Sequence, residues 1–218
     1  MQKMLYLMSK IRNVLMLLLA LAPASATAGV YEDMMHAIRT DDDQTVANLL
    51  KRGMDVDTVS PQGESLLTLA VREGKISVIK TILAARPRVN SRNALGETAL
   101  MLAALKGQTE VAKLLLDQGA EVNQSGWTPL IYSAVHNHVD IARLLIGRGA
   151  RIDAAAENGT TALMMAAREG HLQMVLLLLE HGADINNRTP FGYTALGMAL
   201  DRGKHEVAEI LIKAGAEQ

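Results

Sequence analysis

The chain repeats a short phrase at a nearly constant interval, and this interval limits the possible folds more than any other feature of the sequence. Five similar segments each open on a glycine: Gly63, Gly96, Gly126, Gly159 and Gly192. A second phrase follows in register, as in LLLDQGAEVN and LLLLEHGADIN. An interval of about 33 residues is typical of stacked repeats, so we expect a solenoid whose core runs between neighbouring units.

Each unit has the sequence features of two short helices joined by a turn. A threonine stands where the first helix of four units begins, and a hydroxyl there can accept a hydrogen bond from a backbone N–H that lacks a helical partner. These residues are Thr98, Thr128, Thr161 and Thr194. Small pairs such as Ala103–Ala104 let neighbouring first helices approach closely. Glycines that we expect in the left-handed conformation end the second helices: Gly53, Gly119, Gly149, Gly182 and Gly215.

These phrases resemble the ankyrin repeat, whose pattern runs G-x-T-P-L-x-x-A-A and then L-L-x-x-G-A-D-V-N. The resemblance covers residues 30–218 and implies an all-α repeat solenoid, an ankyrin-repeat stack of helix–turn–helix units with projecting β-hairpin loops. About six repeats are expected, of which the first and last act as caps. Their boundaries are 30–59, 60–92, 93–123, 124–155, 156–188 and 189–218.

Two departures from the repeat pattern bear on the structure. The unit that starts at Gly96 is three residues short, so we expect a truncated loop around Asn123-Gln124-Ser125. In the second unit Arg86 replaces the glycine that ends the second helix. Because Pro87 follows, we expect that helix to stop by a different device.

Residues 1–28 have the three-part layout of a secretory signal peptide. Basic residues precede an apolar run from Val14 to Ala22, and small residues end the segment at Ala26-Thr27-Ala28. Cleavage is expected after Ala28, with a cut after Ala26 as the second choice. A membrane anchor is the alternative, but nine apolar residues are too few to cross about 30 Å of hydrocarbon. The sequence thus predicts a bacterial protein exported to the periplasm, or alternatively secreted, without stable membrane insertion after cleavage.

Composition argues against several classes of function. The 22 basic residues include Lys3, Lys10 and Arg12, so cleavage leaves 19 basic against 23 acidic residues, which gives no support for nucleic acid as a partner. Cysteine is absent, which excludes thiolate metal sites. His136-x-His138 is the only close histidine pair, and we find no catalytic or phosphate-binding motif. The expectation is a noncatalytic protein with no cofactor and no metal site.

The resemblance implies that a partner protein binds a concave surface made of loop tips and the exposed side of the first helices. The helical positions are Arg72, Glu73, Leu105, Lys106, Val135, His136, Arg168, Glu169, Asp201 and Arg202. The loop positions are Gln62, Glu64, Leu95, Glu97, Trp127, Glu157, Phe191 and Tyr193. Because aromatic side chains often dominate binding energy, we predict Trp127 and the Phe191/Tyr193 pair as anchors. The alternative is that these aromatics pack on adjacent loops and stiffen the row of tips.

The expected function is therefore a noncatalytic protein–protein interaction module that binds another exported protein. Two roles remain open at this point: protector or assembly aid of a periplasmic enzyme, and immunity protein against an incoming toxin. The alternative is a secreted effector that binds host proteins. A fold of this kind does not identify the partner.

Overall fold

The computed structural model describes residues 29–217. The predicted signal segment 1–28 and its cleavage site lie outside the described residues. Within residues 29–217 the only β pairing is an isolated bridge between Val59 and Ser65. The described chain is a stack of short helices, as the sequence predicts.

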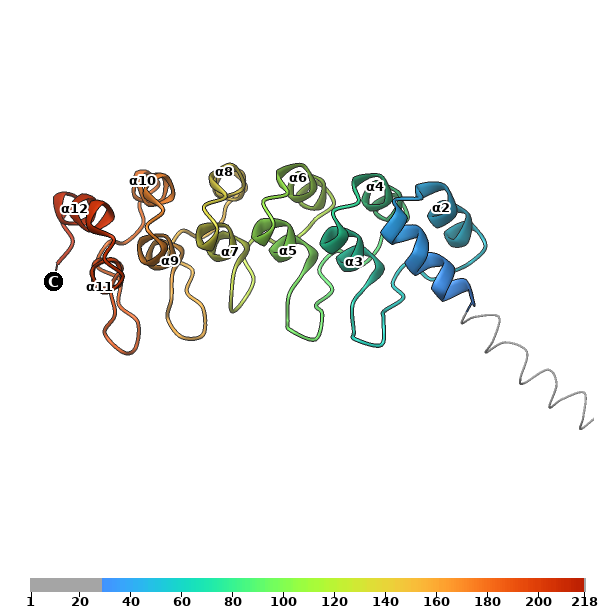
Figure 1. Ribbon diagram of the computed structural model, residues 1–218, viewed down its shortest axis with the longest axis horizontal. Helices are drawn as coiled ribbons and strands as arrows, with labels where there is room; N and C mark the ends of the chain where they lie inside the picture. Colours follow the sequence, from blue (N-terminus) through green and yellow to red (C-terminus); the bar gives the residue numbers. More distant parts are fainter. Residues whose placement is uncertain (1–28, 218) are drawn as a thin grey trace, which may run out of the picture.

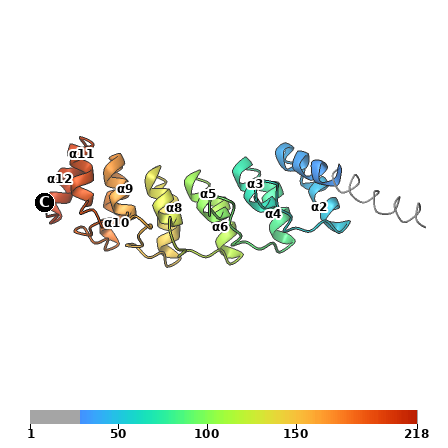
Figure 2. The same ribbon diagram turned by 90° about the horizontal axis from the view of Figure 1, so that it is seen from below.

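The helices form two rows, and each unit contributes one helix to each row (Figure 1). The first helices are residues 29–40, α3 (Leu66–Glu73), α5 (Ala99–Leu105), α7 (Pro129–Val135), α9 (Ala162–Glu169) and α11 (Ala195–Asp201). The second helices are α2 (Asp43–Lys51), α4 (Ile76–Ala84), α6 (Thr109–Asp117), α8 (Val139–Gly147), α10 (Leu172–Glu180) and α12 (His205–Lys213). Figure 2 shows the units following one another in chain order, so the two ends of the described chain lie at opposite ends of the array.

The predicted threonine caps are present at the first helices. Thr128 Oγ1 accepts a hydrogen bond from the Ile131 N–H at 3.2 Å, and Thr194 Oγ1 accepts one from the Gly197 N–H at 3.0 Å. Helices of seven or eight residues, such as α7 and α9, are too short to be stable alone in water. The caps therefore fix where each helix begins, and contact with the neighbouring units keeps it folded.

Small side chains bring the first helices together, and leucines fill the space behind them. Ala103, Ala104, Ala166 and Ala167 are fully buried where α5, α7, α9 and α11 contact one another in order. Leu115 and its counterparts are also fully buried between the rows. Because each unit packs on its two neighbours only, stability is a sum of interfaces along the array.

Left-handed residues end the second helices, and one of them corrects the sequence interpretation. The five predicted glycines have φ between 82° and 97°. Arg86 also has a positive φ, of 56°, so the expectation of a different stop signal before Pro87 was wrong. The chain makes the same turn there with a residue that carries a Cβ, at a steric cost of about 1–2 kcal/mol.

The projecting loops are hairpin-like turns closed by paired backbone hydrogen bonds. In the last loop the Thr189 N–H donates to Tyr193 O, and the Gly192 N–H donates to Thr189 O, both at 2.9 Å. The same pair of bonds closes the loops before α3, α5 and α9. The loop before α7 has no such pair within the described chain and is visibly shorter (Figure 1). The missing three residues of this unit therefore shorten a tip, and α5 still packs directly on α7.

Asparagine side chains link the turns of successive units. Asn123 Oδ1 accepts a hydrogen bond from the Arg151 N–H at 2.8 Å, and Asn123 Nδ2 donates to Gly149 O at 2.8 Å. Asn90 makes the same two contacts one unit earlier, and Asn186 makes them two units later. These bonds join the turn after one second helix to the turn after the next and so help to hold the spacing between units.

Candidate protein-binding surface

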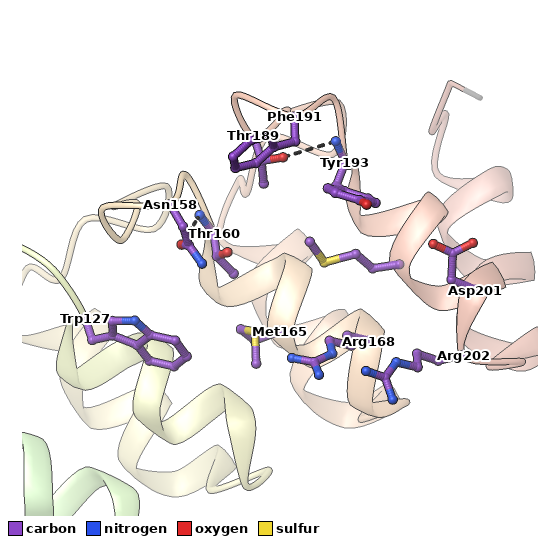
Figure 3. A pocket seen from close by; sticks show the side chains of 11 residues that line it. Trp127, Asn158, Thr160, Met165, Arg168, Thr189, Phe191, Tyr193, Asp201 and Arg202 are labelled. Carbon is purple, nitrogen blue, oxygen red and sulfur yellow. Dashed lines mark hydrogen bonds between the residues drawn. The ribbon is translucent and has the colours of Figure 1, made fainter.

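The last three units enclose a cleft between the loop tips and the first helices. It encloses about 370 Å³ and is lined by six of the residues predicted from the sequence: Trp127, Arg168, Phe191, Tyr193, Asp201 and Arg202. Figure 3 shows Phe191 and Tyr193 on the loop side of the cleft and Arg168 and Arg202 on the helix side. Trp127 lies at the opposite end from Tyr193 (Figure 3). The cleft therefore has an aromatic wall on the loop side and, on the helix side, a wall that carries two arginines and Asp201.

The aromatic residues differ in how much surface they leave open. Phe191 is 80% exposed at the tip of its turn, so it is not packed against a neighbouring loop. Tyr193 is 51% exposed and Trp127 is 36% exposed. Exposed aromatic side chains at a concave surface can contribute large contact areas to a partner at low entropic cost. Phe191 and Tyr193 thus present more free surface than Trp127 does.

Trp127 is held by a small network that joins its own unit to the loop of the preceding one. Its ring packs on Tyr132 of α7, with ring centroids 5.5 Å apart and planes at 48°. The Tyr132 hydroxyl donates to Glu97 Oε1 at 3.3 Å, and Asn93 Nδ2 donates to Glu97 Oε2 at 3.0 Å. Burial, and then the negative charge of Glu97 that accepts this bond, raise the pKa of Tyr132 to about 12. The loop before α5 therefore positions the aromatic pair at the start of the cleft.

The guanidinium groups of the two cleft arginines make no hydrogen bond to an acidic side chain within the described chain. Arg168 Nε lies 3.7 Å from Glu169 Oε1, which is longer than a hydrogen bond. Arg202 follows the end of α11 and makes no ion pair within the described chain. Asp201 is the one acidic residue among the lining residues. The lining therefore carries a net positive charge and unused N–H donors.

The remaining predicted residues lie outside this cleft. Arg72 forms an ion pair with Glu64 and lines a separate hollow beside Leu95, nearer the N-terminal end. Other predicted positions lie along the same row at or after the ends of their helices: Glu73, Leu105, Lys106, His136 and Glu169. The predicted surface is thus continuous along the array, and only its C-terminal half is hollowed into the aromatic and cationic cleft.

Five lining residues were missed by the sequence analysis: Asn158, Thr160, Met165, Thr189 and Met198. Met165 and Met198 are one repeat apart and occupy the position that Tyr132 occupies in α7. The repeat register could have revealed this set of equivalent positions. They are occupied by tyrosine or methionine, whereas the position that follows holds a small residue in each of these units. Asn158, Thr160 and Thr189 are ordinary turn residues, and no pattern distinguishes them from other loop positions.

His138 and His171 link neighbouring units. His138 Nε2 lies 3.0 Å from Leu105 O, and His171 Nε2 lies 2.9 Å from Val135 O, so each ring reaches the first helix of the preceding unit. Gln108 Nε2 donates to Val71 O at 3.0 Å in the same way. Among residues 29–217 no group of three potential metal ligands comes together. In the same range no helix has the length and apolar character needed to cross a membrane.

Comparison with protein families agrees with this architecture. The family model described as ankyrin repeats (3 copies) matches residues 67–156 and 152–218. These matches cover more than half of the chain, which therefore belongs to the ankyrin-repeat family. Ankyrin repeats are in general protein–protein interaction modules. A search of curated proteins finds no significant match.

Proposed function

We propose that this protein is exported by its N-terminal segment, which is then removed, and that it acts as a noncatalytic binder of another exported protein. The periplasm is the proposed site of action, because residues 1–28 have the layout of a secretory signal peptide. The lack of cysteine fits a compartment where thiols oxidise. The absence of a recognisable catalytic or phosphate-binding motif supports the noncatalytic role.

The observation that carries this proposal is the cleft at the C-terminal half of the concave surface. It brings Trp127, Phe191 and Tyr193 together with two arginines, and aromatic and arginine side chains are enriched at the energetic centre of protein interfaces. The short helices and capped turns around it are fixed by contacts within the array, so little order has to be gained when a partner binds. A preformed cleft with exposed aromatic residues suits recognition of a specific protein.

Affinity capture from the source cells tests this function. The protein is purified with a tag from cells that express the full chain, next to a Trp127→Ala/Tyr193→Ala double variant. A Leu176→Ala variant is the control, because Leu176 is 41% exposed on the second-helix row, away from the cleft. We expect a protein that the parent and the control retain and the double variant loses. If the parent, the double variant and the control all retain this protein equally, the binding site lies elsewhere on the surface.

The role of the complex is tested separately. We propose protection or assembly of a periplasmic enzyme, or neutralisation of a toxin, as the two outcomes of binding. Growth rescue on co-expression with the captured protein would identify a toxin, whereas a loss of enzyme activity in cells lacking the binder would identify a client enzyme. Cell fractionation tests the location: a mature form found only in the culture medium would contradict the periplasm and favour a secreted effector.

A further inference from the structure

We propose that the cleft binds an extended segment of the partner in which acidic and large apolar side chains alternate. This inference rests on the proposed function and adds the chemistry of the partner at this surface. Four features support it: the size of the cleft, the number of units that line it, the separation of its two walls and the lack of a hydrogen-bonded acidic partner for its arginines.

The size of the cleft favours a protruding segment over a broad folded face. Its volume of about 370 Å³ is at the lower end of pockets for small ligands, which run from roughly 300 to 1,000 Å³. Such a space admits a few side chains. A flat protein surface would leave the cleft unfilled, and unfilled space between surfaces forfeits contact energy.

The cleft is long enough for a short stretch of extended chain. Its lining begins at Trp127, directly before α7, and reaches Tyr193, directly before α11. Since packed helices lie about 8–10 Å apart, two steps along the row span about 20 Å. An extended chain rises about 3.3 Å per residue, so about six residues would follow the cleft from end to end.

Each wall of the cleft would contact a different set of side chains of that segment. Successive side chains of an extended chain point to opposite sides. Alternate residues would therefore face the exposed rings of Phe191 and Tyr193 on the loop side, where apolar side chains bury most surface. The residues between them would face Arg168 and Arg202 on the helix side (Figure 3).

The repeat register explains why the arginines of the cleft can bind carboxylates. Arg168 occupies the position of Arg72 three units earlier, and Arg72 is paired with Glu64 from its own loop. In the unit of Arg168 the position of Glu64 is taken by Thr160, which has no charge. Arg168 therefore lacks the partner that Arg72 has. A guanidinium group with unused donors binds a carboxylate strongly and often through two bonds.

Selection from a random peptide library tests the inference directly. The library is panned against the protein from cells that express the full chain, and a synthetic peptide of alternating Glu and Phe is then titrated. Trp127 is the only tryptophan of the protein and lines the cleft, so its fluorescence reports binding. We expect enrichment of alternating acidic and apolar sequences, and binding at least about tenfold tighter than that of a Gln/Phe peptide.

Variants of the arginines distinguish recognition of acidic side chains from nonspecific peptide binding. Arg168→Gln with Arg202→Gln should weaken binding of the Glu/Phe peptide about tenfold or more. Arg143→Gln, an exposed arginine on the second helix α8, should leave binding unchanged. Arg168→Glu with Arg202→Glu should reverse the preference towards a Lys/Phe peptide, a gain that an unfolded variant does not show.

Three results would overturn the inference: no enrichment, enriched peptides without alternating acids, or equal binding of the Glu/Phe and Gln/Phe peptides. These results are distinct from a failure of the proposed function. If capture yields a partner that requires Trp127 and Tyr193 while the acidic peptides show no preference, the binding surface stands and the alternating segment is wrong.

Discussion

The hydroxyl of Tyr132 donates a hydrogen bond to Glu97 Oε1 across 3.3 Å and joins helix α7 to the loop of the preceding unit. Because Trp127 packs on the Tyr132 ring, the same contact fixes the entrance of the cleft. One hydrogen bond thus connects the spacing of two units with the orientation of a predicted binding residue.

Replacing Tyr132 with Phe should lower the free energy of unfolding by about 1 kcal/mol, the usual contribution of one such bond. The ring remains and continues to support Trp127, so the loss of stability should come with a small change in Trp127 fluorescence. Urea unfolding followed by circular dichroism measures the first effect, and the emission spectrum measures the second. A variant as stable as the parent would show that the contact between the Tyr132 hydroxyl and Glu97 adds nothing to folding.

The same residue predicts a dependence of stability on alkaline pH. The ordinary tyrosine pKa is 10.0, and in the folded protein the pKa of Tyr132 is raised to about 12. Between these values the unfolded chain has lost the proton and the folded chain still holds it, so stability is complete below pH 10 and falls as pH rises towards 12. Urea titrations at about pH 9 and pH 11 should show this fall. The fall should be smaller in Tyr132→Phe, and equal falls would exclude Tyr132 as the cause.

Gly159 and Gly126 form a matched pair for testing how closely the loop tips pack. Both have a positive φ, 78° and 80°, so an alanine at either costs about 1 kcal/mol of backbone strain. A Cβ on Gly159 would lie 3.0 Å from the Thr189 Cα and closer still to Pro190, whereas a Cβ on Gly126 would meet nothing within 4 Å. Gly159→Ala should therefore destabilise by about 2–3 kcal/mol and Gly126→Ala by about 1.

Thermal unfolding of the two glycine variants gives the comparison. Gly159→Ala should also weaken partner binding, because it displaces the turn that carries Phe191. Equal losses of stability in the two variants would mean that the last two loop tips are not in contact as described.

Arg86→Gly should stabilise the protein by roughly 0.5–1 kcal/mol, because glycine adopts the positive φ of 56° without the clash of a Cβ. Arg52 provides the control: it also follows a second helix, but its φ is −78°. Arg52→Gly should therefore be neutral or destabilising. Urea unfolding of both variants decides the point, and stabilisation by both would indicate an effect of charge and not of backbone conformation.

Trp127→Ala should weaken partner binding by more than about 1 kcal/mol, as expected for an aromatic anchor that a partner covers. Loss of its contact with Tyr132 should also lower the free energy of unfolding by about 0.5–1.5 kcal/mol. Isothermal titration with the captured partner measures the first quantity, and urea unfolding measures the second. Unchanged affinity with reduced stability would make Trp127 a structural residue only.

Much of the fold was predictable because each repeated residue has a local task. Thr128 caps its helix through the backbone N–H of Ile131, only three residues further on. Gly119 adopts its left-handed conformation because it has no side chain, independently of the neighbouring units. Arg86 was misread for the opposite reason. Its stop signal was inferred from Pro87 next to it, whereas the surrounding array imposes the same turn on arginine as on glycine.

The site was predictable only in part. The repeat register placed Trp127 and Tyr193 on one face, but it carried no information about the depth of the cleft, which depends on how three loops and the helices α9 and α11 enclose space. The contact of Tyr132 with Glu97 joins residues 35 positions apart and required the relative placement of two units. Such contacts depend on side-chain packing across an interface, and periodicity alone does not specify them.

The short loop before α7 shows that a tip of the proposed binding surface can lose residues while the packing of the helices is kept. Three residues are missing from one tip, yet α7 still packs between α5 and α9, and Asn123 still bonds to the backbone of Gly149 and Arg151 in the next unit. Insertions, deletions and substitutions can therefore accumulate at the loop tips while the sequences of the helices stay the same. A lineage of such chains could change partners many times while inheriting a single scaffold.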